Sequence, residues 1–122
     1  MAVQILYAKE TGKELAFGNL DDTINMTDYL REVIEEMFVE KEYSEDDEEI
    51  TYRVVEYKNI GKLVEVSRAS EEEILEELKD VRGNEKRTEL VLKLKDLSLL
   101  NQVIFKALLQ DCEDSAKVVA LL

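Results

Sequence analysis

The hydrophobic residues of this chain recur with two different periods, and each period predicts one kind of element. Near the N-terminus, residues 3–8 (VQILYA) predict a strand, and residues 14–17 (ELAF) predict its returning partner. Between them, Gly12 supplies the positive φ that a tight turn often needs. The first part of the chain is therefore expected to form a β-hairpin.

A second hairpin is predicted in the middle of the chain. Residues 50–57 (ITYRVVEY) are rich in β-branched and aromatic side chains, which favour strands. The run 58–62 then predicts a turn, and residues 63–67 predict a returning strand. Further along, apolar and polar side chains alternate over residues 88–95 (TELVLKLK), which predicts one more strand with a single apolar face.

A period of about 3.6 residues predicts three helices. In the first, residues 28–42, the apolar side chains form one stripe, and Thr27 is placed to cap the first turn. The acidic run 44–49 that follows this helix predicts a loop. The second covers residues 70–83, begins with a Ser-x-x-Glu capping box and ends at a glycine. The third begins after a cap at Asp96 or Ser98.

In chain order these elements read ββα-ββα-βα, which predicts an α+β fold: an antiparallel sheet of about five strands with about three helices packed on one face. The length of 122 residues predicts one domain, residues 1–122, around a single core. Residues 3–42 and 50–83 match weakly at an offset of 49, which indicates either a ββα pseudo-repeat or two unrelated hairpins with a glycine turn. The apolar tail, residues 115–122, is expected to pack on the body or on a second copy.

Composition limits the possible functions mostly through what the chain lacks. There is no histidine, so Ser-His-Asp and Cys-His catalysis and imidazole metal sites are excluded within the chain. The single cysteine, Cys112, has no second thiol to pair with, and the N-terminus lacks the features of a signal peptide, so a cytoplasmic protein is expected. No run of about 20 apolar residues predicts a membrane span.

The negative charge of the chain is concentrated in one segment. Residues 21–49 contain 13 acidic and two basic residues, a net charge of −11 out of −13 for the whole chain. Such one-sided charge attracts a partner of opposite sign. Residues 82–95 reverse the balance, with five basic and two acidic residues, and are expected to contact the acidic face within the molecule or in a dimer. The candidate partner-binding residues are Asp28, Glu32, Glu35, Glu36, Glu42, Glu45, Asp46, Asp47, Glu48 and Glu49.

Three interpretations of this acidic segment are open: a mimic of nucleic-acid phosphates, a general docking surface for a basic protein patch, or a solvated face that only keeps the protein in solution. Carboxylates three or four residues apart on a helix lie about 5–6 Å apart, a charge density comparable to that along one DNA strand. The first two interpretations predict a non-enzymatic inhibitor or decoy that docks on a basic, nucleic-acid-handling protein and binds no nucleic acid itself. By analogy only, phage-borne anti-defence inhibitors of nucleases and immunity proteins use negative surfaces in this way.

Two other functions have weaker support. A structural or chaperone-like module would dimerise through the apolar tail. A Mg²⁺-dependent nuclease would use the loose pattern Asp47…Glu56-x-Lys58, although such a pattern is unspecific in a chain with 29 acidic and 16 basic residues. The continuous acidic run 45–49 lacks the alternating ligands and the glycine of an EF-hand loop, so no metal or other cofactor is expected.

Overall fold

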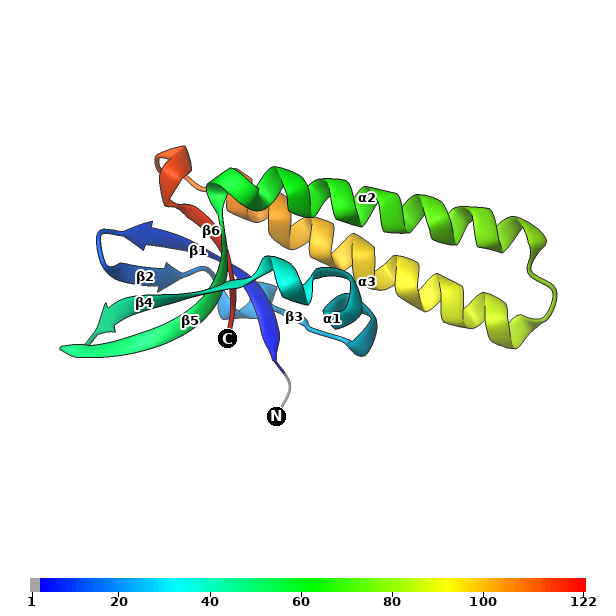
Figure 1. Cartoon of the computed structure of the whole chain (residues 1–122), viewed down its shortest axis with the longest axis horizontal. Coiled ribbons are helices and arrows are strands. Elements are labelled where there is room, and N and C mark those ends of the chain that lie inside the picture. Colours follow the sequence, from blue (N-terminus) through cyan, green and yellow to red (C-terminus); the bar gives the residue numbers. More distant parts are fainter. Residues whose placement is uncertain (1–2) are drawn as a thin grey trace.

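The computed structural model describes residues 3–122, which form a curved antiparallel sheet with a long helical hairpin across one face (Figure 1). The strands are β1 (Gln4–Thr11), β2 (Glu14–Phe17), β3 (Ile24–Asn25), β4 (Val39–Glu45), β5 (Glu48–Glu56) and β6 (Lys117–Leu121). The helices are α1 (Asp28–Ile34), α2 (Tyr57–Asp80) and α3 (Asn84–Leu108), with short 3₁₀ turns η1 (Leu20–Asp22), η2 (Glu35–Met37) and η3 (Asp114–Ala116).

The last strand of the chain lies in the middle of the sheet. The strand order is β2-β1-β6-β5-β4, with β3 paired to the start of β1, and every pair is antiparallel. Val119 of β6 is opposite Tyr7 of β1 on one side and Val55 of β5 on the other. The β6 strand therefore joins two hairpins that are otherwise far apart in the sequence.

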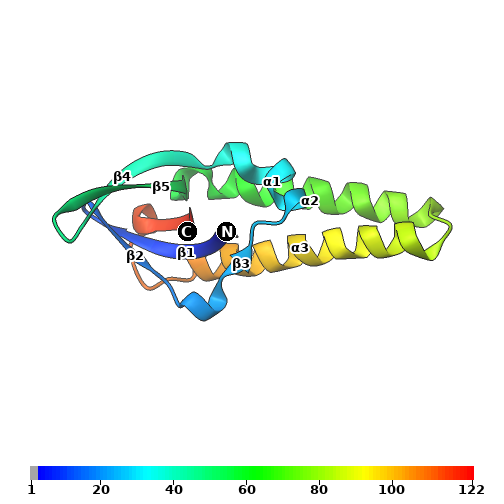
Figure 2. The ribbon, with the colours of Figure 1, turned by 90° about the horizontal axis from the view of Figure 1, so that it is seen from below.

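The sheet curls until its two edge strands meet. Figure 2 shows the β1–β2 and β4–β5 turns coming together at the same end of the molecule, and the amide of Ser44 on β4 donates a 2.7 Å hydrogen bond to the carbonyl of Lys13. The concave side holds a small core of its own, in which the rings of Phe17 and Tyr52 meet edge to face at 5.1 Å. The buried members of this core are Leu6, Ala8, Tyr43, Val54, Val118 and Ala120.

The three helices cover the other face of the sheet. Ile5, Val55 and Val119 project from the strands into the main core, where α2 and α3 supply the facing apolar side chains and α1 packs against both helices. Between the two long helices, the buried Ser67 donates a 2.9 Å hydrogen bond to Asn101. The hairpin extends well beyond the sheet, with α1 beside its middle (Figure 1).

The predicted class is confirmed: the fold is α+β, with an antiparallel sheet of the expected size and three helices. Local signals identified several elements correctly. The first hairpin turns at Gly12 with φ +61°, and residues 50–56 lie within a strand. Thr27 caps α1, because its hydroxyl accepts a hydrogen bond from the amide of Leu30 at 3.2 Å.

The predicted return strand at 63–67 is wrong, because α2 runs without interruption from Tyr57 through these residues. Ile60, Leu63, Ser67 and Ile74 are its buried positions, and their spacing follows the helical period. The segment 58–62 is therefore part of a helix rather than a turn, and the predicted cap of the second helix lies inside α2. Because residues 50–83 fold as one strand and one helix, the ββα pseudo-repeat is absent from the fold.

The predicted strand at 88–95 is also wrong, because these residues belong to α3. Leu90 and Leu97 are buried two turns apart on the same side of the helix, whereas Leu92 is exposed. Over only a few residues, the apolar positions fit both the helical period of 3.6 and the strand period of two. Packing of this segment against α2 therefore determined that it is helical.

The first predicted helix is shorter than expected. It ends at Ile34 and is followed by η2 and by the strand β4, which the sequence pattern had assigned partly to the helix and partly to an acidic loop. Lys41 and Tyr43 alternate with the exposed Glu40 and Glu42, which is the period of two of a half-buried strand.

The apolar tail is the central strand β6, so it packs within the body of the molecule, which is the first of the two outcomes expected for it, and not on a second copy. We expect a chain ended at Ser115 to lose its cooperative thermal unfolding transition, because neither β1 nor β5 would keep its β6 partner and both cores would open. Circular dichroism during heating measures this. Leu122→Ala, at a half-exposed side chain beyond the strand, serves as the control and should unfold like the wild type. A truncated chain with an unchanged melting curve would contradict the central position of β6.

Candidate functional site

Six of the ten candidate residues form the free end of the β4–β5 hairpin. Asp46 and Asp47 make its two-residue turn with φ of 51° and 64°, a conformation that aspartate adopts more readily than most residues. The register places Glu45 opposite Glu48, so like charges face each other across the hairpin. All six side chains are exposed: Glu42, Glu45, Asp46, Asp47, Glu48 and Glu49.

The other four candidates lie on α1 and η2. Asp28, Glu32 and Glu36 are exposed. Glu35 differs, because its carboxylate pairs with Arg31 at 3.1 Å and with Arg53 at 3.7 Å. Arg53 also donates to the Glu35 carbonyl at 3.0 Å, so Glu35 fixes η2 against β5 and contributes less free charge to the surface.

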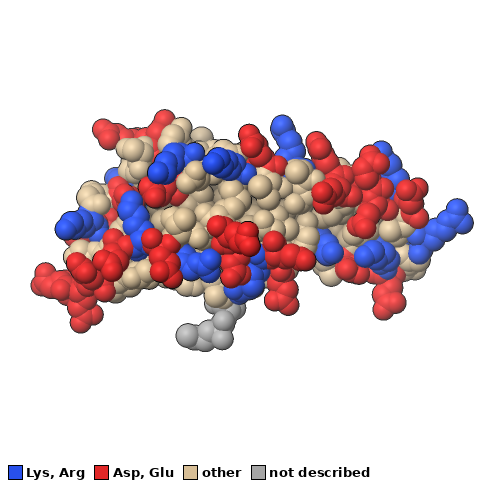
Figure 3. Space-filling model, viewed as in Figure 1, with Lys and Arg blue, Asp and Glu red and all other residues tan. Residues whose placement is uncertain are grey.

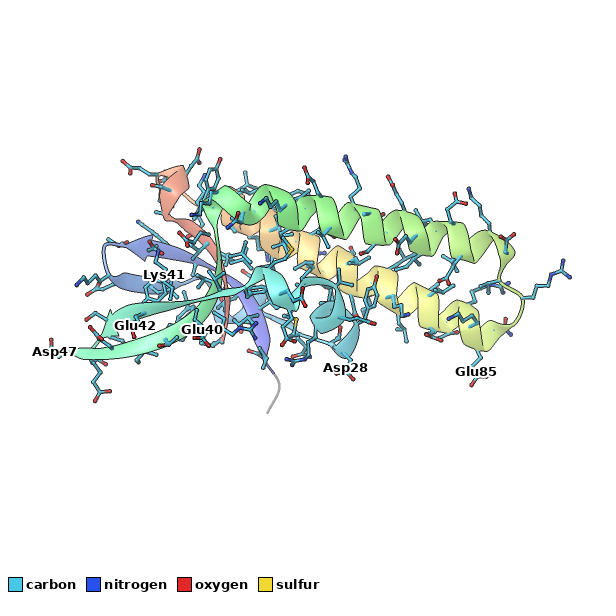
Figure 4. All side chains as sticks on the ribbon, in the orientation of Figure 1. Asp28, Glu40, Lys41, Glu42, Asp47 and Glu85 are labelled. Carbon is cyan, nitrogen blue, oxygen red and sulfur yellow. The ribbon has the colours of Figure 1, made fainter. Side chains whose placement is uncertain are left out.

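Strand β4 connects these two groups. Its seven residues span about 24 Å, so the candidates do not converge on one spot. Figure 4 shows Glu40 and Glu42 on β4 between Asp47 at the hairpin end and Asp28 on α1. Glu40 was not among the predicted residues, although its alternation with Lys41 could have identified it as an exposed strand position. We call the ten exposed carboxylates the acidic edge: Asp28, Glu32, Glu36, Glu40, Glu42, Glu45, Asp46, Asp47, Glu48 and Glu49.

The carboxylates of the acidic edge are free of ion pairs within residues 3–122. The ion pairs that the structure contains use other acidic residues, such as Glu35, Glu10 and Asp22. Within the edge, Glu45 accepts a 3.0 Å hydrogen bond from the hydroxyl of Tyr52, which leaves its charge in place. Two basic residues lie near the acidic edge. Lys13 shares a small pocket with Glu42 and Glu49. Arg53 is opposite Glu40 in the strand register. With ten carboxylates beside these two basic residues, the edge is a strongly negative surface, and repulsion among its members opposes folding.

A second acidic group, missed in the sequence, lines a groove of about 820 Å³ between α1 and the long helices. Its acidic lining residues on α2 are Glu72, Glu73, Glu76, Glu77 and Asp80. Tyr29 and Lys93 complete the lining, with the Lys93 ammonium 5.2 Å from the ring centroid, and burial raises the pKa of the Tyr29 phenol. The sequence contains a signal for this group, because its carboxylates are spaced four residues apart, as on one side of a helix. The net charge of residues 50–122 is close to zero, so a count of charge over that whole segment did not reveal the local excess. Figure 3 shows acidic side chains gathered over this far half of the helices as well as over the β4–β5 end.

The basic residues around the start of α3 do not neutralise the acidic edge. Lys86 and Lys93 both pair with Glu89 of their own helix, at 3.6 Å and 3.5 Å. Among residues 3–122 no ion pair joins the segment 82–95 to the edge, so the expected internal contact is not formed.

A half-buried ionic cluster holds the curled sheet together. Lys41 donates to both oxygens of Glu10 at 2.9 Å and lies 3.6 Å from Glu56, while the hydroxyl of Tyr43 donates to Glu10 at 2.8 Å. The hydrogen bond to Glu10 raises the pKa of Lys41. Burial, followed by the bond to Glu10, raises the pKa of Tyr43. Because its members come from β1, β4 and β5, the cluster ties the edge strand β4 across the concave side.

The nuclease pattern is not assembled. Asp47 and Glu56 lie at opposite ends of β5, roughly 30 Å apart along an extended chain, and Glu56 contacts Lys41. The part of the chain that the structure describes contains no cluster of three or more His, Cys, Asp or Glu side chains arranged to hold a metal ion. None of its helices has the length and apolar content that a membrane span requires.

Comparisons with protein-family models, with curated proteins and with solved structures found no match to this chain. The geometry of the surface is therefore the basis for a functional proposal.

The ionic cluster predicts a loss of stability at alkaline pH. Lys41 and Tyr43 bind their protons more tightly in the folded state than at their ordinary pKa values of 10.5 and 10.0. Their contribution to stability is therefore complete below those values and is lost as pH rises through the higher folded values. We expect the urea concentration at the unfolding midpoint to fall as pH rises above about 10, and to fall less steeply in Tyr43→Phe.

Tyr57→Phe is the matched control for this measurement, because its hydroxyl donates a 3.3 Å hydrogen bond to the exposed Asp114 outside the cluster, and its removal leaves the cluster intact. If the urea midpoint of Tyr43→Phe falls as steeply with rising pH as that of the wild type, the Tyr43 hydroxyl does not contribute to the loss of stability.

Proposed function

We propose that this protein is a non-enzymatic binding protein whose acidic edge docks on the basic surface of a nucleic-acid-handling protein and occupies it as an inhibitor or decoy. The observation that carries the proposal is the acidic edge itself: ten exposed carboxylates along α1, η2 and the β4–β5 hairpin, without an ion-pair partner among residues 3–122. A contact with a basic protein would neutralise charges that the fold leaves uncompensated.

The arrangement of the charges supports a partner that normally follows a nucleic-acid backbone. Glu40 and Glu42 are two residues apart on the same side of β4, so their Cβ atoms are about 6.7 Å apart along the strand. One DNA strand carries a phosphate about every 3.4 Å of axis, so this row offers about one charge for every two phosphates. The next position on this side of β4 is Ser44, and Glu49, which is opposite Ser44 on β5, continues the row toward the hairpin end. At the other end of β4, the exposed carboxylates of η2 and α1 extend it.

The rigidity of the scaffold supports the same proposal. The hairpin is held at its base by the ionic cluster and at its side by the Ser44–Lys13 hydrogen bond, so the carboxylates are presented on a preorganised strand pair. Preorganisation reduces the conformational entropy that binding must remove.

Charge reversal tests the location of the contact. Glu42→Lys, Glu48→Lys and Glu49→Lys together should abolish capture of a nucleic-acid-binding protein from a nuclease-treated host extract, and excess duplex DNA should displace that protein from the wild type. The matched control reverses three exposed acidic residues away from the edge, Glu65→Lys, Asp111→Lys and Glu113→Lys, with the same change in net charge. Equal loss in both triple variants would mean that net charge, not the edge, drives binding. Capture that DNA does not displace would rule out a nucleic-acid-binding surface as the target.

Salt tests the nature of the contact. For the partner captured in this way, we expect the dissociation constant measured by calorimetry to rise at least about tenfold between low and 0.3 M salt, because exposed charges are screened beyond about 8 Å at physiological ionic strength. The edge-reversed variant should show a much flatter dependence. A dissociation constant that is constant over this range would refute electrostatic docking.

A further inference from the structure

The helical hairpin has an outer face that neither the sheet nor α1 covers. On α2 the residues of this face are spaced by four, three, four, three and four positions: Tyr57, Gly61, Val64, Arg68, Glu71 and Leu75. Each retains at least part of its exposure, whereas the neighbouring Ile60, Leu63 and Ser67 are buried against α3 and the sheet. This alternation of three and four is the a/d spacing of helices that pack on another helix.

Helix α3 carries a matching row at spacings of three, four, three and four: Val91, Leu94, Ser98, Asn101 and Phe105. Asn101 contacts Ser67 of α2 by a hydrogen bond, which places the two rows side by side. Helix α1 lies on the other side of the hairpin, where its Tyr29 contacts Lys93. We call the two rows together the outer seam.

The outer seam is apolar and poor in charge. Phe105 is 56% exposed, Val91 50% and Leu75 45%. In a chain with 29 acidic and 16 basic residues, the seam contains one of each, Arg68 and Glu71, so it carries no net charge. The repulsion expected between two copies of a molecule with a net charge of −13 is therefore weakest at this face.

We propose that the outer seam binds a second copy of this chain, with the two hairpins antiparallel about a two-fold axis. An axis that crosses α2 midway between Arg68 and Glu71 places each Arg68 opposite Glu71 of the other copy, which gives two identical ion pairs. The same axis places Val64 opposite Leu75 of the second copy. Neither Arg68 nor Glu71 has an ion-pair partner within the described chain, so both charges are available.

The same two-fold axis also pairs the exposed residues of α3. Because Ser67 is opposite Asn101, the midpoint between Arg68 and Glu71 lies beside Ser98. An axis at Ser98 brings Val91 opposite Phe105 of the second copy, so the two most exposed apolar residues of the row cover each other. Large and small side chains thus alternate across the proposed contact.

The outer seam also has a hollow and an area suited to a dimer contact. A mostly apolar hollow of about 260 Å³, lined by Tyr57, Gly61, Val64 and Leu108, lies at the end of the seam that would receive Leu75 of the second copy. Helix α2 is about 36 Å long, and two helices side by side are about 20 Å wide, so each copy would bury about 700 Å². Stable interfaces bury about 800 Å² per partner. The α1 side of the hairpin stays uncovered, so this inference does not rest on the proposed function.

Sedimentation equilibrium of the full chain tests the dimer. The wild type should approach twice the monomer mass of 14.1 kDa in the micromolar range. Leu75→Glu combined with Phe105→Glu should remain at the monomer mass, and circular dichroism should confirm that it is folded. The matched control, Leu20→Glu with Leu92→Glu, changes residues that are 62% and 55% exposed but lie off the seam, and it should dimerise like the wild type. A wild type that stays at the monomer mass at every concentration overturns the proposal, because the seam then does not bind a second copy.

A charge exchange tests the axis. Arg68→Glu alone and Glu71→Arg alone should each weaken dimerisation at least about tenfold, because like charges then face each other twice. The double variant Arg68→Glu/Glu71→Arg should recover the dissociation constant of the wild type to within about threefold. Single variants that dimerise normally, or a double variant that does not recover, overturn the antiparallel arrangement.

Discussion

The insertion of β6 between β1 and β5 is the constraint on which the rest of this structure depends. Val119 and Leu121 of β6 face the helices, and Val118 and Ala120 face the concave core, so four of its five residues contribute to the two sides of the sheet. Without this strand the two hairpins would share only the Ser44–Lys13 backbone hydrogen bond and the side-chain hydrogen bonds to Glu10. With it, the sheet is continuous and curls far enough for β4 to reach β2.

The curl of the sheet explains how a strongly acidic segment is placed in a folded protein. Strand β4 sends Lys41 and Tyr43 inward to Glu10, and sends Glu40 and Glu42 outward to solvent. On the inward side Lys41 is paired with Glu10 and Glu56, and the partly buried groups are hydrogen-bonded, as such groups must be. The outward side carries all the uncompensated charge. The same strand therefore stabilises the sheet with one face and presents the acidic edge with the other.

The charge of the molecule is distributed unevenly over three surfaces. The acidic edge and the groove beside α1 carry carboxylates, whereas the outer seam on the other side of the hairpin carries apolar side chains and one residue of each sign. In the proposed dimer, the seam would be buried and two acidic edges would remain accessible. Two edges on one particle would raise the effective concentration for a partner with two basic sites.

Local sequence was enough to predict the features that depend on neighbours a few residues away: the turn at Gly12, the cap at Thr27, the strand over 50–56 and the excess of carboxylates between Asp21 and Glu49. It also determined the α+β class. Tertiary structure decided that residues 63–67 and 88–95 are helical, because runs of five to eight residues satisfy both periods and only the opposite helix distinguishes them. It likewise decided that the tail is a central strand, since this depends on pairing between segments about 60 to 115 residues apart. The predicted carboxylates form a line rather than a patch because residues 39–45 pair with β5 as a strand instead of continuing a helix.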